Sequence, residues 1–172
     1  MKNPVFDQRH LVEYVVYGLI AGLMYVIPVW IYLFEAKYVL SWFAFLGNIL
    51  FMFAIMGYCI KLSRRRSDYS STWIMIVSAH CVIFVGIVFS VIFSAILCFV
   101  YIPAFMTGHS PTNFLQNSPT GFNIHNTSTI VMIFLTATFA NFGAGSFTAI
   151  LCPYVFKPNQ TKDEAIAVKP GV

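Results

Sequence analysis

The chain has 172 residues, of which 59% are hydrophobic and only 9% are charged, and its mean hydropathy is +0.78. Because a soluble domain carries roughly 25% charged residues, this composition excludes an ordinary water-soluble fold. Residues 69–156 contain no Asp, Glu, Lys or Arg at all. The net charge of +4 comes from basic residues beside apolar segments, which favours a role in membrane orientation and gives no reason to expect a nucleic-acid partner.

Four apolar segments are long enough to cross a bilayer, whose hydrocarbon core takes about 20 helical residues. They cover residues 11–34, 39–62, 72–102 and 128–156. The segments are continuously apolar and lack the alternation of a barrel strand, so a β-barrel is disfavoured. The sequence therefore predicts an all-α polytopic membrane protein, a four-transmembrane-helix antiparallel bundle in which residues 1–172 form a single membrane domain.

The basic residues predict the orientation of this bundle. All of them except Lys37 fall on one side of the predicted spans. By the positive-inside rule both termini are cytoplasmic, the tail 157–172 is inside and the loop 103–127 is outside. The inner loop between spans two and three also suits anionic lipid head groups, at about 1 kcal/mol per basic residue. Its basic residues are Lys61, Arg64, Arg65 and Arg66.

Small residues recur at helical spacing in three of the spans. In lipid, tight helix packing depends on close backbone approach through such residues. A single pair of small residues four positions apart arises by chance about as readily as by selection for helix packing. The regular series of small residues in span three favours packing. The candidate packing residues are Gly18 and Gly22 in span one, Gly86, Ser90 and Ser94 in span three, and Ala140, Ala144 and Gly145 in span four. The "GAGS" stretch of span four resembles a phosphate loop, but no strand precedes it and no charged partner is nearby.

Polar residues within the spans are the usual pointers to function in membrane proteins. The chain offers Glu13, Asn48, His80 and Asn141. The two asparagines suit interhelical hydrogen bonds, and together with His80 they also suit a polar path through the bundle. Glu13 and His80 lie at similar depth in the cytoplasmic half, which motivates the hypothesis that their side chains pair.

The sequence contains no catalytic or cofactor-binding set that we can name. A bis-histidine haem site needs a second histidine at the depth of His80, and the other three histidines lie outside the spans. The four cysteines lie within or at the edges of apolar runs and form no CxxC pair, which is typical of buried apolar side chains. We therefore expect no catalytic residue, no metal and no cofactor.

The layout resembles a family of small four-span inner-membrane proteins of Bacteroidota that carry a domain of unknown function. The resemblance rests on "YGLIAGL" in span one, a short outer hairpin, a basic inner loop, a long third span rich in small residues, and a lysine-containing tail. It implies a multi-pass protein of the bacterial inner (cytoplasmic) membrane and no catalytic residues. Members often carry an acidic helical insertion before the last span, where this chain has an uncharged loop rich in Asn, Ser and Pro.

Two functions of different class follow from these observations. The first is a non-enzymatic accessory or scaffold subunit that is embedded in the bilayer and packs against other integral membrane subunits or against itself. The alternative is a small transporter or channel with a polar path through Asn48, His80 and Asn141. A membrane enzyme acting on lipid is a third possibility, without a candidate catalytic set.

Overall fold

The computed structural model describes residues 8–64, 72–102, 105, 115–117 and 127–156. Within these ranges the chain is helical apart from short connections, and an isolated bridge between Lys37 and Gln116 is the only β pairing. The elements are α1 (Gln8–Glu35), the 3-10 turn η2 (Tyr38–Trp42), α2 (Phe43–Ser63), α3 (Thr72–Tyr101), α4 (Thr127–Leu135), the π-helical turn η3 (Thr136–Ala140) and α5 (Asn141–Phe156).

Four helical segments of the described chain are long and apolar enough to cross a membrane, which confirms the predicted all-α fold and its four long apolar helices. They are His10–Glu35, Tyr38–Ser63, Thr72–Tyr101 and Thr127–Phe156. The last one is assembled from α4, η3 and α5 in continuous succession. The third and fourth have 30 residues each, about 45 Å of helix at 1.5 Å per residue. They therefore exceed a hydrocarbon core of about 30 Å, as their apolar length predicts.

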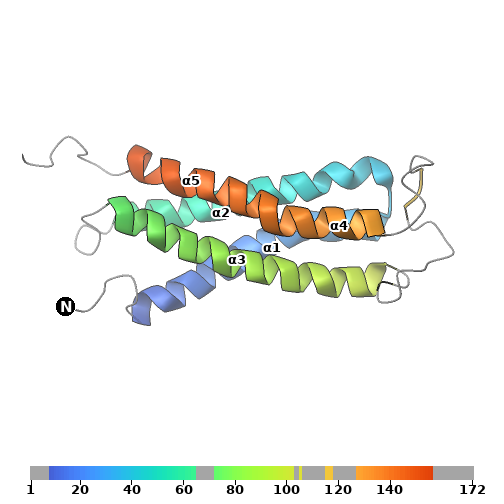
Figure 1. The fold of residues 1–172 in the computed structure, drawn as a ribbon, viewed down its shortest axis with the longest axis horizontal. Coiled ribbons are helices and arrows are strands. Elements are labelled where there is room, and N and C mark those ends of the chain that lie inside the picture. Colours follow the sequence, from blue (N-terminus) through green and yellow to red (C-terminus); the bar gives the residue numbers. More distant parts are fainter. Residues whose placement is uncertain (1–7, 65–71, 103–104, 106–114, 118–126, 157–172) are drawn as a thin grey trace, which may run out of the picture.

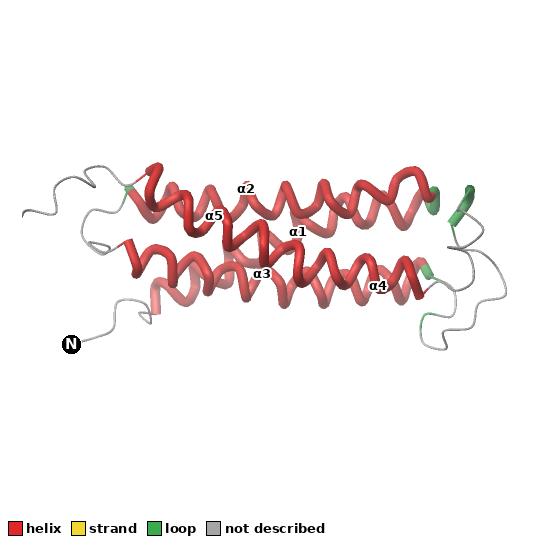
Figure 2. The backbone as a smooth tube through the Cα atoms, turned by 45° about the horizontal axis from the view of Figure 1, so that its top comes forward, coloured by secondary structure: helices red, strands yellow, loops and turns green. Residues whose placement is uncertain are grey.

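Successive segments run in opposite directions in one elongated bundle, so that α1 and α3 are parallel to each other (Figures 1 and 2). The start of α1 and the end of α5 lie at the same end of it (Figure 1). α1 packs against α2 and α3, and α5 packs against the same two helices. The α1–α2 interface and the α3–α5 interface therefore lie on opposite sides of the bundle. A polar side chain in one of these interfaces cannot contact a polar side chain in the other.

The GxxxG pair of α1 packs directly onto α3. A Cβ added to Gly18 would come within 2.6 Å of Val85 Cγ1, and one added to Gly22 within 2.8 Å of Phe89 Cβ. Real Cβ atoms essentially never approach so closely, so both positions need glycine. The backbone nitrogen of Gly86 lies 3.0 Å from the Cβ that Gly18 lacks. The two helix backbones thus come into near contact along the predicted seam.

The small residues of α3 and α5 also face the interior of the bundle. A Cβ on Gly86 would lie 2.9 Å from the ring of Phe51 on α2, and one on Gly145 would lie 2.9 Å from Ile83 of α3. Ser90 and Ser94 are fully buried. Ala140 and Ala144, by contrast, are half-buried, so this stripe is only partly covered by neighbouring helices.

At the predicted outer end, part of the long loop folds back onto the α1–α2 connection. The backbone N–H of Gln116 donates to Ala36 O at 2.8 Å, and the N–H of Tyr38 donates to Gln116 O at 3.1 Å. Ala36 has a φ of 50°, a left-handed conformation that turns the chain sharply after α1. Leu115 is buried beside this bridge. The described residues of loop 103–127 therefore close the end of the bundle.

Candidate functional site

A cluster of uncharged polar side chains, which we call the polar centre, lies in the middle of the bundle. Its core is a hydrogen bond from Asn48 Nδ2 to Asn141 Oδ1 at 2.7 Å. Asn141 in turn donates to Ser90 Oγ at 3.4 Å and to Ala137 O at 3.1 Å. Asn141 and Ser90 are fully buried, and Asn48 is 7% exposed. The two asparagines thus join three separate helices, α2, α3 and α5.

The π-helical turn η3 supplies a backbone acceptor to the polar centre. Asn48 Nδ2 also donates to Thr136 O at 2.9 Å. In η3 the backbone N–H of Asn141 bonds to Thr136 O, five residues back, and such wide turns often accompany functional positions in helices. The hydroxyls of Thr136 and Thr138 each bond to the carbonyl four residues earlier, at 2.9 and 2.7 Å. Hydroxyl bonds of this kind compete with regular α-helical geometry, which accounts for the local widening.

Tyr25 of α1 completes the polar centre. Its hydroxyl bonds to Ile133 O at 2.9 Å and to Thr136 Oγ1 at 2.8 Å, and the side chain is fully buried. Tyr25 is not among the polar residues predicted from the sequence. A signal was present, because a tyrosine in the middle of an apolar span needs a partner for its hydroxyl. With Tyr25, all four spans contribute to one hydrogen-bonded cluster.

The side of the polar centre toward the predicted cytoplasmic end is closed by apolar side chains. Phe51 and Ile55 follow Asn48 along α2, and both are fully buried. Ile83 of α3 is also fully buried and contacts Gly145. These residues separate the polar centre from that end. The arrangement is suited to fixing helices, and its described residues include no nucleophile and base at bonding distance.

His80 lies apart from the polar centre. It precedes Ser90 by ten residues on α3, about 15 Å by helical rise. Its Nδ1 donates to Ile76 O at 2.8 Å, since a carbonyl can only accept. The imidazole lies edge-on to the ring of Phe142 on α5, with 6.5 Å between centroids. Phe142 is itself 42% exposed, so His80 occupies the rim of the α3–α5 interface.

Glu13 forms an ionic cluster on the opposite side of the bundle, and its expected pairing with His80 is wrong. Glu13 Oε1 lies 3.3 Å from Lys61 Nζ on α2, and Glu13 Oε2 lies 3.9 Å from His10 Nδ1. Lys61 also sits 5.0 Å above the ring of Tyr17. Glu13 and His80 match in depth, but the α1–α2 and α3–α5 interfaces face away from each other.

The basic loop is only partly within the described residues. Arg64 caps the end of α2 and is exposed, while Arg65 and Arg66 lie outside the described ranges. The Lys61 side chain is 40% exposed and bound to Glu13. Lys61 therefore contributes to a helix–helix contact as well as to the positive charge of this end.

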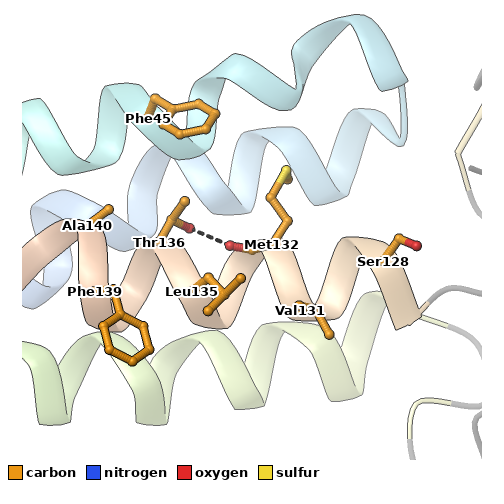
Figure 3. A pocket seen from close by; sticks show the side chains of 8 residues that line it. All are labelled: Phe45, Ser128, Val131, Met132, Leu135, Thr136, Phe139 and Ala140. Carbon is orange, nitrogen blue, oxygen red and sulfur yellow. Dashed lines mark hydrogen bonds between the residues drawn. The ribbon is translucent and has the colours of Figure 1, made fainter.

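An open apolar groove of about 700 Å³ runs along α4 and η3 beside α2. Figure 3 shows Phe45 on α2 facing Thr136 and Met132 across it, with Ser128 at one end and Ala140 at the other. The groove is lined by Phe45, Ser128, Val131, Met132, Leu135, Thr136, Phe139 and Ala140. Thr136 thus borders both the groove and the polar centre, although its hydroxyl is already bonded within the bundle.

No family model, no curated protein and no solved structure matches the chain.

Proposed function

We propose that this chain is a non-enzymatic accessory or scaffold subunit of the bacterial inner membrane, with both termini in the cytoplasm. The proposal rests on the contrast between the polar interior of the bundle, whose side chains bond to one another, and its apolar outer surface. The central polar side chains bond to one another or to backbone carbonyls. The outward surface, by contrast, is dominated by large apolar side chains. We infer that its function depends on other membrane proteins, or a second copy of this chain, that pack against this surface.

A conducting path receives less support from the same contacts. The alternative function requires a route that joins Asn48, Asn141 and His80. The two asparagines bond to each other, whereas His80 bonds to its own helix and lies at the bundle rim. Buried Phe51, Ile55 and Ile83 fill the interior on the side of the polar centre toward the predicted cytoplasmic end.

Two outward-facing glycines mark where a partner helix would approach. Gly57 on α2 and Gly143 on α5 are exposed, and an added Cβ would meet nothing within 4 Å at either position. The seam glycines Gly18, Gly22 and Gly86 are in contact with neighbouring helices of this chain. Because close approach in lipid depends on small residues, Gly57 and Gly143 are the glycines of the described helices still open to a second protein.

The experiment compares outward substitutions with exposed controls. Membranes are extracted in mild detergent, and the native mass of the purified protein is measured for wild type and for Gly57→Leu, Gly143→Leu. The matched controls are Ile49→Leu and Ile150→Leu, because Ile49 and Ile150 are 50% and 48% exposed on the same helices. We expect wild type and the controls to carry a partner chain or a second copy, and the glycine variants to lose it while staying folded. A wild-type protein that runs as a lone monomer contradicts the proposal.

A further inference from the structure

Cys59 on α2 and Cys152 on α5 are spaced like the two asparagines of the polar centre. α2 and α5 run in the same direction through the bundle (Figure 1). Asn48 and Asn141 are 93 residues apart and bonded to each other, and the two cysteines have the same separation, eleven residues further along each helix. Eleven residues make about three turns of α-helix. Both helices are regular over that length, so the cysteines face each other as the asparagines do.

The two thiols are in contact between α2 and α5. The side chains of Cys59 and Cys152 are hydrogen-bonded to each other, and both cysteines are free. They are 1% and 5% exposed. Each lies four residues before the end of its helix, about 6 Å by helical rise. The pair is therefore buried but close to the predicted cytoplasmic end, from which a small neutral molecule has a short way to travel.

The other two cysteines are arranged differently. Cys81 and Cys98 both lie on α3, about 25 Å apart by helical rise. Because a disulfide needs Cα atoms within about 7 Å, they cannot bond to each other in the folded chain. The protein thus carries one facing dithiol and two separate cysteines that serve as an internal reference.

The surroundings of the dithiol favour a neutral product. Ile55 and Leu62 on α2 and Ala149 on α5 are fully buried apolar side chains beside the two cysteines. A monovalent metal held by two thiolates would leave a negative charge among them, which is costly. A divalent metal such as zinc takes further ligands, and the described residues contain no group of three or more that could hold a metal. A disulfide is neutral and needs no third group.

The end of α5 is suited to the small adjustment that a disulfide requires. The sulfur atoms must approach to about 2.05 Å. Pro153 follows Cys152 inside α5, and proline has no backbone N–H to donate to the carbonyl four residues earlier. The last turn of α5 is therefore held by one helical hydrogen bond fewer than usual.

We propose that Cys59 and Cys152 form a redox site, which hydrogen peroxide oxidises to a disulfide that joins α2 to α5. Cys152, the more exposed of the two, attacks the O–O bond, so that its sulfur becomes a sulfenic acid and one water leaves. The Cys59 sulfur then attacks the sulfenic sulfur, the S–S bond forms and the oxygen leaves as a second water. The two thiols lose the electrons and protons that the peroxide gains.

The position of the site indicates a reversible modification. In a reducing compartment disulfides are usually transient and redox-sensing, and thiol exchange returns them to the reduced form. The disulfide would close the α2–α5 interface covalently at the predicted cytoplasmic end. The site is separate from the outward surface on which a partner would dock, so it does not depend on the proposed scaffold role.

The test treats native membranes that contain the full chain with hydrogen peroxide and then blocks the remaining thiols with N-ethylmaleimide. Chymotryptic peptides are analysed by mass spectrometry without reduction. We expect a linked pair of peptides that contain Cys59 and Cys152. It should be at least about tenfold more abundant than any pair with Cys81 or Cys98, because proximity raises the effective thiol concentration. Dithiothreitol before digestion should remove it.

Two controls separate proximity from reactivity. The chain unfolded in dodecyl sulfate and then oxidised should give links among all four cysteines. The double variant Cys81→Ser/Cys98→Ser should form the Cys59–Cys152 link as wild type does. Oxidised wild type should also resist unfolding by dodecyl sulfate better than reduced wild type, because the cross-link constrains the unfolded chain.

Two results with wild type alone would overturn the assignment. The first is folded protein without the Cys59–Cys152 link, or with equally abundant links to Cys81 or Cys98. The second is a loss of reactive thiols that a copper(I) chelator restores without a reductant, because the pair would then hold a metal. Neither result depends on how a variant folds.

Discussion

The side-chain amide of Asn48 on α2 donates to the side-chain oxygen of Asn141 on α5 at 2.7 Å, in the fully packed middle of the bundle. Ninety-three residues separate the two along the chain. The contact brings the second and fourth spans into register, and Asn141 extends it to Ser90 on α3. Interior hydrogen bonding thus adds to the close packing of small residues in aligning the helices.

Replacing Asn48 by Leu should lower the free energy of unfolding by about 1 to 2 kcal/mol, because the Thr136 carbonyl and Asn141 Oδ1 lose their shared donor. Unfolding in detergent micelles, titrated with dodecyl sulfate, measures the change. The single variant Asn141→Leu and the double variant Asn48→Leu/Asn141→Leu complete a double-mutant cycle. The double variant should lose less stability than the two single changes added together, and strictly additive losses would show that the two amides do not interact.

Gly47 and Gly57 provide a matched pair on α2. A Cβ at Gly47 would lie 2.6 Å from Tyr25 O, a backbone atom that cannot move aside, whereas one at Gly57 would meet nothing within 4 Å. Gly47→Ala should therefore destabilise the bundle by separating α1 from α2. Gly57→Ala should be neutral or stabilising, by up to about 1 kcal/mol, because alanine is the better helix former. Thermal unfolding of both variants checks the prediction, and equal effects would contradict the packing of α1 on α2.

Tyr25→Phe removes one hydroxyl from the polar centre and keeps the aromatic ring in place. Because that hydroxyl bonds to both Ile133 O and Thr136 Oγ1, we expect a loss of about 1 kcal/mol in the free energy of unfolding. The same micelle titration measures it. Unchanged stability would mean that the hydroxyl is satisfied equally well in the unfolded chain.

The ionic cluster predicts a coupling between Glu13 and Lys61 and none between Glu13 and His80. Lys61→Met removes the cation that lies 3.3 Å from a mostly buried carboxylate, so it should destabilise more than Glu13→Gln. Since Lys61 is 40% exposed, the coupling energy should be no more than about 1 kcal/mol. A second cycle of Glu13→Gln with His80→Gln should give additive effects. Coupling in that second cycle would place the two residues together after all.

The spans were predictable from the sequence because length and hydropathy are properties of single segments. The depth of Glu13, Asn48, His80 and Asn141 followed equally well from their positions along each span. Which neighbouring helix each of these residues faces depends on how the four helices pack together, and the sequence of a single segment does not contain this information. For this reason matching depth suggested a Glu13–His80 pair, although the two residues lie on opposite interfaces of the bundle.

The π-helical turn and the role of Tyr25 were not foreseen. Thr136 and Thr138 carried a local signal, since their hydroxyls bond to carbonyls of the preceding turn, but such threonines are common in regular helices too. The widened turn matters because Asn48 reaches its Thr136 carbonyl. The side chain that binds this carbonyl, Asn48, lies on another helix, so a local sequence pattern cannot reveal the contact.

The central claim is that the interior polar groups hold the helices together and do not conduct. The most direct measurement compares wild type with Asn141→Leu in reconstituted vesicles, following ion and solute flux together with the free energy of unfolding. We predict no flux above empty vesicles for either protein, and a less stable variant. Flux through wild-type protein that Asn141→Leu abolishes, with stability unchanged, would contradict the account.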